Sequence, residues 1–174
     1  MSLLNNRYNQ KMDVSKLIEY CRMHGITLAI AESCTGGHVA DLITDIAGAS
    51  AVFLSGLVAY SRDAKVGMLG VPTTLLEKHG LVSREAAIAM ADCMRLLAHA
   101  DYAIATTGNL GPAVLEGKPC GLVHIAVSSA ERVYSRELHL GGDRAGNKQD
   151  ASLAALQLLA EALHEEKSYD EHAV

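Results

Sequence analysis

The segment spanning residues 27–37 holds the side chains of this chain best suited to nucleophilic chemistry. It reads Thr-Leu-Ala-Ile-Ala-Glu-Ser-Cys-Thr-Gly-Gly, an apolar strand pattern that turns into a helical pattern at His38. The first N–H groups of a helix lack backbone partners and carry partial positive charge. In such a turn the Ser33 hydroxyl can attack a carbonyl carbon beside ready oxyanion donors, or the turn can hold a phosphate. The alternative is structural, with Ser33 or Thr35 capping the helix.

A serine nucleophile needs a base, and the histidines of this chain form no Ser-His-Asp set. Lysine is the next candidate. The sequence Tyr60-Ser-Arg-Asp-Ala-Lys65 places Tyr60 at the end of a predicted strand and Lys65 one turn into the next helix. A lysine that is partly desolvated, or close to another cation such as Arg144, loses affinity for its proton and can act as a base. Tyr60 could relay a proton or orient a substrate; the alternative is a tyrosine that closes a strand and a solvated lysine.

Two further places offer polar groups for binding. Thr107, Gly108 and Asn109 supply a hydroxyl, backbone N–H groups and an amide at the end of another predicted strand. Arg144 stands just before the last predicted helix, where a guanidinium suits a phosphate or a carboxylate. The alternative for Arg144 is a surface salt bridge with a nearby aspartate, which contributes little to stability.

The elements that must position these residues alternate along the chain. Hydrophobic periodicity and turn residues predict strands at 27–31, 51–60, 101–107, 120–128 and 132–140, the last two as a hairpin, and helices at 17–23, 37–47, 61–69, 73–79, 83–99 and 147–164. This order predicts an α/β fold, a three-layer α/β/α sandwich with a mixed, mostly parallel sheet of about five strands. The strand at 51–60 is apolar nearly throughout, which predicts cover on both faces. Because ligands gather at the carboxyl ends of such strands, we expect Ser33, Tyr60 and Thr107 to converge.

Length and composition limit the class of protein. The 174 residues fit one domain, expected at 12–166 with flexible termini at 1–11 and 167–174. A net charge of −5 without a basic stripe argues against nucleic acid as a partner, and the apolar runs are too short to cross a membrane. The four cysteines form no Cys-x-x-Cys pair, which predicts neither a zinc site nor a disulfide framework and fits reduced thiols in the cytoplasm.

With these residues identified, the chain resembles the CinA C-terminal domain family over about residues 14–164. The resemblance rests on eight blocks in order: Ala31-Glu-Ser-Cys-Thr-Gly-Gly37, Thr44-Asp-Ile-Ala-Gly-Ala-Ser50, Tyr60-Ser-x-x-Ala-Lys65, Gly70-Val71, His79-Gly80-x-Val82-Ser83, Gly108-x-x-Gly-Pro112, Lys118-Pro-x-Gly121 and Gly142-Asp-Arg144. Several blocks in one order are far more specific than any single block.

The resemblance implies an amidase. Stand-alone members of this family are nicotinamide-nucleotide amidases, which convert nicotinamide mononucleotide to nicotinate mononucleotide and ammonia with a serine and a lysine. Carried over by position, Ser33 is the nucleophile, Lys65 the base and Tyr60 an assistant in proton transfer or positioning. The roles implied for the remaining positions are oxyanion binding by the backbone of Thr35, Gly36 and Gly37, pocket lining by Thr107, Gly108 and Asn109, and binding of the anionic end of the substrate by Arg144. No metal or organic cofactor is implied, and the implied partner is a small pyridine nucleotide.

This sequence departs from the family pattern near the expected pocket. Leu110 stands where a small residue is usual, Lys148 replaces an arginine one helical turn after Arg144, and the loop at 113–117 is more apolar than usual. Two alternatives therefore stay open: a nucleotide-binding or regulatory module without turnover, and an amidase for another small carboxamide. Self-association is also possible, because the apolar helices at 84–98 and 151–163 offer surface for it unless the sheet uses both.

Overall fold

Five strands form a single mixed sheet in the order β2-β1-β3-β4-β5. The structure is a computed structural model that describes residues 13–172; the expected flexible segment 1–11 lies outside this range, as do residues 173 and 174. The strands are β1 (Leu28–Glu32), β2 (Phe53–Val58), β3 (Tyr102–Gly108), β4 (Leu122–Ser128) and β5 (Val133–His139). β1 pairs in parallel with β2 and β3, whereas β4 is antiparallel to both β3 and β5. The predicted α/β fold with a mixed, mostly parallel sheet is confirmed.

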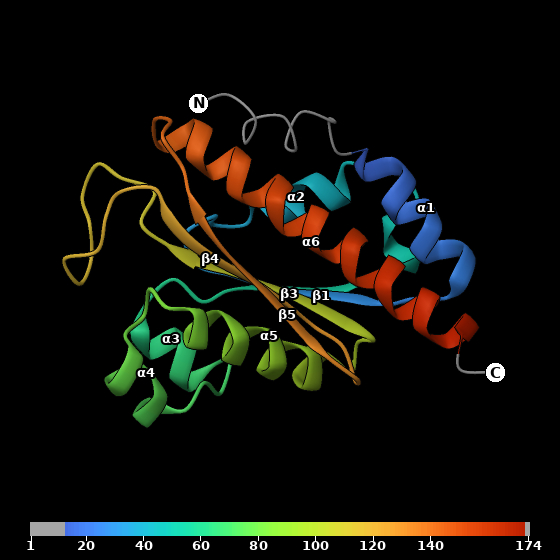
Figure 1. Cartoon of the computed structure of the whole chain (residues 1–174), viewed down its shortest axis with the longest axis horizontal. Helices are drawn as coiled ribbons and strands as arrows, with labels where there is room; N and C mark the ends of the chain where they lie inside the picture. The colour runs from blue at the N-terminus through green and yellow to red at the C-terminus, as the bar shows by residue number, and fades with distance from the viewer. Residues whose placement is uncertain (1–12, 173–174) are drawn as a thin grey trace.

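Helices cover both faces of this sheet (Figure 1). One layer contains α1 (Val14–His24), α2 (His38–Thr44) and α6 (Arg144–His172), and the other contains α3 (Arg62–Gly67), α4 (Thr73–His79) and α5 (Arg84–Ala98). A 3-10 turn, η1 (Ala49–Ala51), leads into β2. The apolar faces of α5 and α6 pack on the sheet, so the core consists of one apolar cluster on each side.

Side-chain size differs between the two faces of the sheet. Ile30 and Ile104 point into the cluster that includes α6, while Ala31 and Ala105 point into the cluster that includes α5. Successive residues of a strand point to opposite faces of the sheet. Because isoleucine and alanine alternate in these strands, the large side chains lie on one face and the small ones on the other. The alanine-lined face leaves room for α5 to lie close to the strands.

β2 is the exception to this burial. It lies at the edge of the sheet, with only β1 beside it, and Leu54 and Val58 are 48% and 46% exposed. The prediction that this strand is covered on both faces is wrong. An apolar sequence alone did not reveal that the short helix α2 covers only part of this strand.

Helix ends follow the capping residues. Gly25 ends α1 in the left-handed conformation, and the Ser61 and Ser83 hydroxyls accept the N–H groups of Ala64 and Ala86, each at 3.0 Å. The last helix begins earlier than predicted, at Arg144, and continues through His172.

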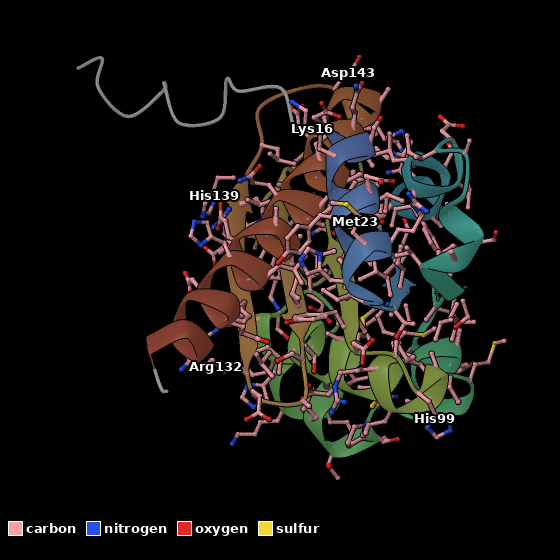
Figure 2. All side chains as sticks on the ribbon, turned by 90° about the vertical axis from the view of Figure 1, so that its right-hand side faces the viewer. Lys16, Met23, His99, Arg132, His139 and Asp143 are labelled. Carbon is pink, nitrogen blue, oxygen red and sulfur yellow. The ribbon has the colours of Figure 1, made fainter. Side chains whose placement is uncertain are left out.

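The first helix, α1, buries only one side of its surface. Leu17, Ile18 and Cys21 are buried, but Met23 is 66% exposed on the outside of α1 (Figure 2). No helix in the range 13–172 is long and apolar enough to cross a membrane.

Candidate active site

The proposed nucleophile Ser33 lies in the turn directly after β1. Its N–H donates to the Thr106 carbonyl on β3 at 3.0 Å, and its own carbonyl accepts the Gly36 N–H at 3.1 Å. The residue is 8% exposed. These bonds fix the backbone on both sides of the hydroxyl, so the direction of the side chain is set by the sheet.

Lys65 points from α3 directly at that hydroxyl. Its Nζ lies 2.7 Å from Ser33 Oγ and 2.7 Å from the Ala59 carbonyl oxygen. The side chain is buried, with 1% exposed, and no described carboxylate forms an ion pair with it. Burial without a counter-charge lowers the pKa of Lys65 to about 8. A substantial fraction of this amine is therefore neutral near pH 7 to 8 and able to accept a proton from serine.

The pairing of β1 with β2 brings these two residues together. Because the strands are parallel neighbours, their carboxyl ends lie at the same edge of the sheet, and the Ala59 N–H donates to the Glu32 carbonyl at 2.8 Å. Ser61 then caps α3 and sets the start of the helix that carries Lys65. The structure thus places the two predicted residues in direct contact, although they are separated by 32 positions in sequence.

The turn after Ser33 is held by a residue to which the sequence analysis gave no role. The Glu32 carboxylate, 1% exposed, accepts the N–H groups of Gly37 at 2.9 Å, Val39 at 3.1 Å and Ala40 at 2.9 Å. It therefore caps α2, and neither Ser33 nor Thr35 does. The residue pattern held no clear signal for this cap, since the path of the turn at Gly36 and Gly37 decides whether the carboxylate reaches these N–H groups.

This cap changes which backbone groups are free for an oxyanion or a phosphate. Of the expected oxyanion donors, the N–H of Gly37 donates to Glu32 and the N–H of Gly36 donates to Ser33, which leaves that of Thr35. No other residue in the described range accepts a hydrogen bond from the N–H of Cys34 or Thr35. The two N–H groups that directly follow the nucleophile are thus the available donors, the position at which oxyanion donors are common in serine hydrolases.

The side chains of Thr35 and Cys34 support the turn rather than supply a second nucleophile. Thr35 Oγ1 lies 2.6 Å from Thr106 Oγ1, and both residues are fully buried. Burial raises the pKa of the Cys34 thiol to about 12, so it stays protonated at neutral pH.

A cavity of about 330 Å³ opens beside this turn. Its wall is formed by Cys34, Tyr60, Gly108, Asn109, Leu110, Ala113, Val114, Leu115 and Arg144. Four of these are apolar side chains from a single loop, residues 109–121. Ser33 and Lys65 are not part of this wall. Cys34, which follows Ser33 in the chain, and Tyr60, which precedes the helix of Lys65, are part of it.

Asn109 gives the loop at 109–121 its shape. Its side-chain amide donates to the carbonyls of Leu115 and Lys118, each at 3.1 Å, and its side-chain oxygen accepts the Leu115 N–H at 3.0 Å. The amide expected to contact substrate is thus engaged within the loop. Leu110 stands where the family usually has a small residue. Its side chain is 3% exposed, packs in the core and also contributes to the cavity wall.

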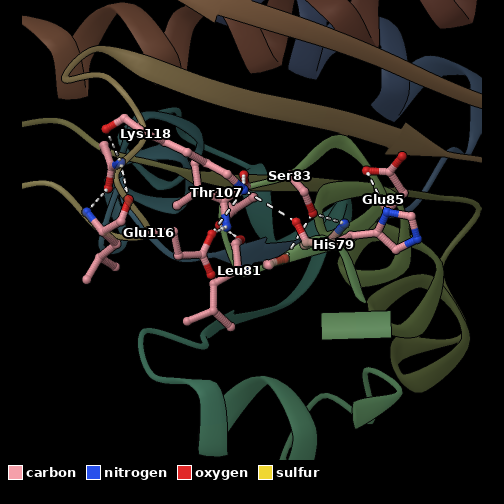
Figure 3. A network of polar contacts seen from close by, with 12 residues as sticks. His79, Leu81, Ser83, Glu85, Thr107, Glu116 and Lys118 are labelled. Atoms are coloured by element: carbon pink, nitrogen blue, oxygen red, sulfur yellow. Dashed lines mark hydrogen bonds and ion pairs between the residues drawn. The ribbon is translucent and has the colours of Figure 1, made fainter. Parts of the chain in front are cut away.

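The same loop is fastened to the segment between α4 and α5 (Figure 3). The Glu116 carboxylate accepts the N–H groups of Leu81 and Val82 at 2.6 and 3.2 Å, and Lys118 Nζ donates to the Val82 carbonyl at 2.6 Å. The Thr107 hydroxyl donates to the Leu81 carbonyl at 2.7 Å, is buried and lies outside the cavity wall. The predicted pocket residue Thr107 therefore contacts this connection.

Arg144 forms part of the cavity wall and contacts two other segments there. Its guanidinium donates to the Gly111 carbonyl at 2.7 Å and to the Tyr60 hydroxyl at 3.1 Å. Tyr60, 60% exposed, thus contacts Arg144, and among the described residues it forms no hydrogen bond with Ser33 or Lys65. A methyl group on Gly36 would lie 3.7 Å from Lys148 Nζ, which places a second cation beside the turn.

These two cations have no carboxylate partner in the described range. The salt bridge considered as the alternative role of Arg144 therefore does not form among the described residues. The neighbouring Asp143 side chain instead accepts the Gly146 N–H at 2.8 Å, at the start of α6. Among the side chains that the structure describes, those of residues 13–166, no three His, Cys, Asp or Glu are grouped so that they could hold a metal ion.

The family assignment follows from comparison with known proteins. A model of the CinA C-terminal domain matches residues 11–163. The chain belongs to this family. It is 44% identical over 144 residues to a putative competence-damage inducible protein of Thermoanaerobacter pseudethanolicus, a match that covers 82% of this chain and 35% of the relative. The chain thus spans about a third of the length of the curated relatives it matches.

Solved structures of similar length share the fold. The competence/damage inducible protein CihA of Agrobacterium tumefaciens is 37% identical with a TM-score of 0.80, and the match covers 86% of this chain and 95% of that one. A CinA superfamily protein of Escherichia coli is 28% identical with a TM-score of 0.82, covering 92% of this chain and 99% of that one. The CinA C-terminal fold therefore accounts for nearly the whole described chain.

Proposed function

We propose that this protein hydrolyses the carboxamide of a pyridine nucleotide, converting nicotinamide mononucleotide and water to nicotinate mononucleotide and ammonia. The observation that carries the proposal is the buried contact of 2.7 Å between Lys65 Nζ and Ser33 Oγ. Burial of the charge of a lysine that has no carboxylate partner destabilises the fold, which favours a functional reason for this contact. The pair is suited to amide hydrolysis without a metal.

The first half of the proposed reaction is acylation of Ser33. Neutral Lys65 removes the hydroxyl proton as Oγ attacks the carboxamide carbon, and the new oxyanion receives the N–H groups of Cys34 and Thr35. Lys65 then gives the proton to the leaving nitrogen, the C–N bond breaks and ammonia departs. An acyl ester on Ser33 remains.

The second half regenerates the enzyme. Lys65 removes a proton from water as the water oxygen attacks the ester carbon, and the same N–H groups bind the second oxyanion. The ester bond breaks, Ser33 recovers its proton from Lys65, and the product leaves as a carboxylate.

Binding of a nucleotide is supported by the wall of the cavity. The apolar side chains of Leu110, Val114 and Leu115 suit a flat aromatic ring. Arg144 and Lys148, which have no described carboxylate partner, suit the phosphate.

Ammonia release tests the proposal. We expect release from nicotinamide mononucleotide by the unaltered protein, and loss of at least about 10²-fold in kcat for both Ser33→Ala and Lys65→Met, since each removes the nucleophile or its base. Ser50→Ala and Lys78→Met change exposed residues of the same types and should keep full activity. Equal rates for Ser33→Ala and the unaltered protein would remove this serine from the reaction.

A nucleotide-binding module without turnover is the second candidate. It is favoured by one observation, that Ser33 and Lys65 are not part of the cavity wall. This candidate predicts that nicotinamide mononucleotide raises the melting temperature while no ammonia appears. Comparing nicotinamide mononucleotide, nicotinamide riboside and nicotinamide in both assays separates it from an amidase for another small carboxamide.

A further inference from the structure

The carboxylate of Glu32 is buried beside the nucleophile, yet the proposed reaction gives it no part. It ends β1, one position before Ser33, and is 1% exposed. A buried carboxylate is costly unless it is hydrogen-bonded, and this one receives its bonds from N–H groups of Gly37, Val39 and Ala40 rather than from a cation. Its place in the fold therefore calls for a specific role.

We propose that Glu32 is a positioning residue, which holds the turn at 33–37 so that the N–H groups of Cys34 and Thr35 point at the reacting carbonyl oxygen. This inference rests on the proposed function, because it assigns a role within the same reaction. Glu32 acts through the backbone and does not touch the substrate.

The bonds of Glu32 close the turn from its far end. At the near end, Ser33 N–H is fixed to Thr106 on β3. Between the two ends, Gly36 and Gly37 have φ of +58° and +98°. Glycine is conformationally free, so these two residues do not hold the turn in one shape by themselves. With the bond from Glu32 to Gly37 removed, the middle of the turn would keep the Gly36–Ser33 bond and the Thr35 hydroxyl contact as its restraints.

Glu32 also settles where negative charge can bind. Its oxygens occupy the N–H groups at the start of α2, so the positive end of that helix faces a carboxylate rather than the cavity. A developing oxyanion is thereby directed to the N–H groups of Cys34 and Thr35, and a phosphate to Arg144 and Lys148. The two anionic parts of a bound nucleotide are kept apart by this arrangement.

The test compares Glu32→Gln with Asp13→Asn. Glutamine keeps the size of the side chain, but its amide NH₂ replaces one accepting oxygen. The turn therefore loses part of the hydrogen bonding that Glu32 provides to Gly37, Val39 and Ala40. Asp13→Asn alters another carboxylate that caps a helix, at 3.3 Å from the Lys16 N–H on α1, outside the cavity wall. Both variants lower the melting temperature, so stability alone does not distinguish them.

Kinetics distinguish them. For Glu32→Gln we expect kcat to fall by about 10- to 100-fold with KM within about twofold, because misdirected oxyanion donors weaken binding of the transition state and not of the substrate; complete loss of one donor typically costs about 10²–10³. The midpoint of the pH profile stays that of the unaltered protein, since Lys65 is untouched. Asp13→Asn keeps kcat and KM. A rise in KM at unchanged kcat for Glu32→Gln, or full activity, would contradict the inference.

A fluorophosphonate separates this inference from the choice of substrate. Ser33 Oγ forms a bond to phosphorus, the P–F bond breaks, fluoride leaves and the serine proton passes to Lys65, while the phosphoryl oxygen takes the oxyanion position. Labelling of Ser33 is followed by mass spectrometry. We expect Glu32→Gln to be labelled at least about tenfold more slowly than the unaltered protein and Asp13→Asn at the same rate.

The outcomes have different meanings. Slow labelling of Glu32→Gln together with no ammonia release by the unaltered protein contradicts the proposed substrate and supports the role of Glu32. Equal labelling contradicts the role of Glu32 whatever the substrate, and no labelling of Ser33 in the unaltered protein contradicts both. If Glu32→Gln does not fold, Glu32→Asp retains the charge on a shorter side chain and should be labelled more slowly than the unaltered protein; a labelling rate equal to that of the unaltered protein overturns the inference.

Discussion

At the scale of single residues, the most informative feature is Lys65, a lysine buried without a carboxylate partner in the part of the chain that the structure describes. Lys65 is buried against Ser33 and Ala59, and its pKa falls to about 8 as a result. In the proposed reaction only the neutral amine can accept the serine proton, so a lowered pKa raises the fraction of protein that could react at neutral pH.

The pH dependence of the reaction follows from this shift. Below pH 8 the amine is increasingly protonated, so kcat/KM should fall about tenfold per pH unit, and above pH 8 it should reach a plateau. A rate profile from pH 6 to 10 with nicotinamide mononucleotide checks this. A midpoint near that of a free lysine, or a rate that falls with rising pH, would be inconsistent with Lys65 as the base.

Arg144 provides a second prediction at this scale. Arg144→Ala removes a cation that has no carboxylate partner, so KM for nicotinamide mononucleotide should rise by about 10- to 100-fold, the loss of one charge-assisted hydrogen bond. KM for nicotinamide riboside, which lacks the phosphate, should change little. The control Arg22→Gln alters an exposed arginine paired with Glu19 on α1 and should change neither constant. An equal rise for both substrates would mean that Arg144 shapes the cavity instead of binding phosphate.

The sequence allowed the contact of Ser33 with Lys65 to be expected but not the role of Glu32. Side chains at the ends of neighbouring parallel strands meet by topology, which a strand pattern can predict. The hydrogen bonds of Glu32 form only because Gly36 and Gly37 adopt positive φ. A residue pattern does not specify these dihedral angles.

At the scale of elements, the loop at 109–121 forms one side of the cavity without regular secondary structure. It keeps its form because Asn109 binds it internally and because Glu116 and Lys118 fasten it to the connection between α4 and α5. Its glycines and prolines are typical of a loop, but they did not indicate that the loop would pack against that connection.

Asn109→Ala should release this loop. The variant loses the three hydrogen bonds of the Asn109 side chain, so we expect about 1–3 kcal/mol less stability and a several-fold higher KM with kcat nearly unchanged. Thermal unfolding and steady-state kinetics measure both. Ser129→Ala, which removes the Oγ that accepts two N–H groups in the turn between β4 and β5, is the matched control. It should lose similar stability at unchanged KM, and a similar rise of KM in both variants would rule out a local effect of the loop.

Boundaries of elements were harder to predict than their existence. All five predicted strands occur, yet β2 is shorter than its apolar run and exposed on one face. α6 starts at Arg144 because Asp143 caps it, three positions before the predicted start at Asn147. Such ends are set by local hydrogen bonds that hydrophobic periodicity does not record.

At the scale of the whole molecule, much of the core lies away from the cavity wall, although Cys34 and Leu110 belong to both. The core cluster with α1, α2 and α6 contains large aliphatic side chains such as Leu159, which is fully buried and lies outside the cavity wall. Leu159→Ala should lower the free energy of unfolding by about 2–5 kcal/mol through lost burial and a residual cavity. Leu97→Ala, at a 56% exposed position on α5, should change it by less than about 0.5 kcal/mol. Denaturant unfolding measures both, and kcat of the folded fraction should be the same in each.

The two halves of the chain contribute differently to the site. Ser33, Lys65 and the turn between β1 and α2 all precede residue 66, whereas most of the cavity wall comes from the segment after residue 107. If the proposed function holds, substitutions in the later segment would change which amide is bound while the Ser33–Lys65 pair stays unchanged. An engineer seeking altered selectivity would diversify positions 110, 113, 114 and 115 and leave residues 1–65 unchanged.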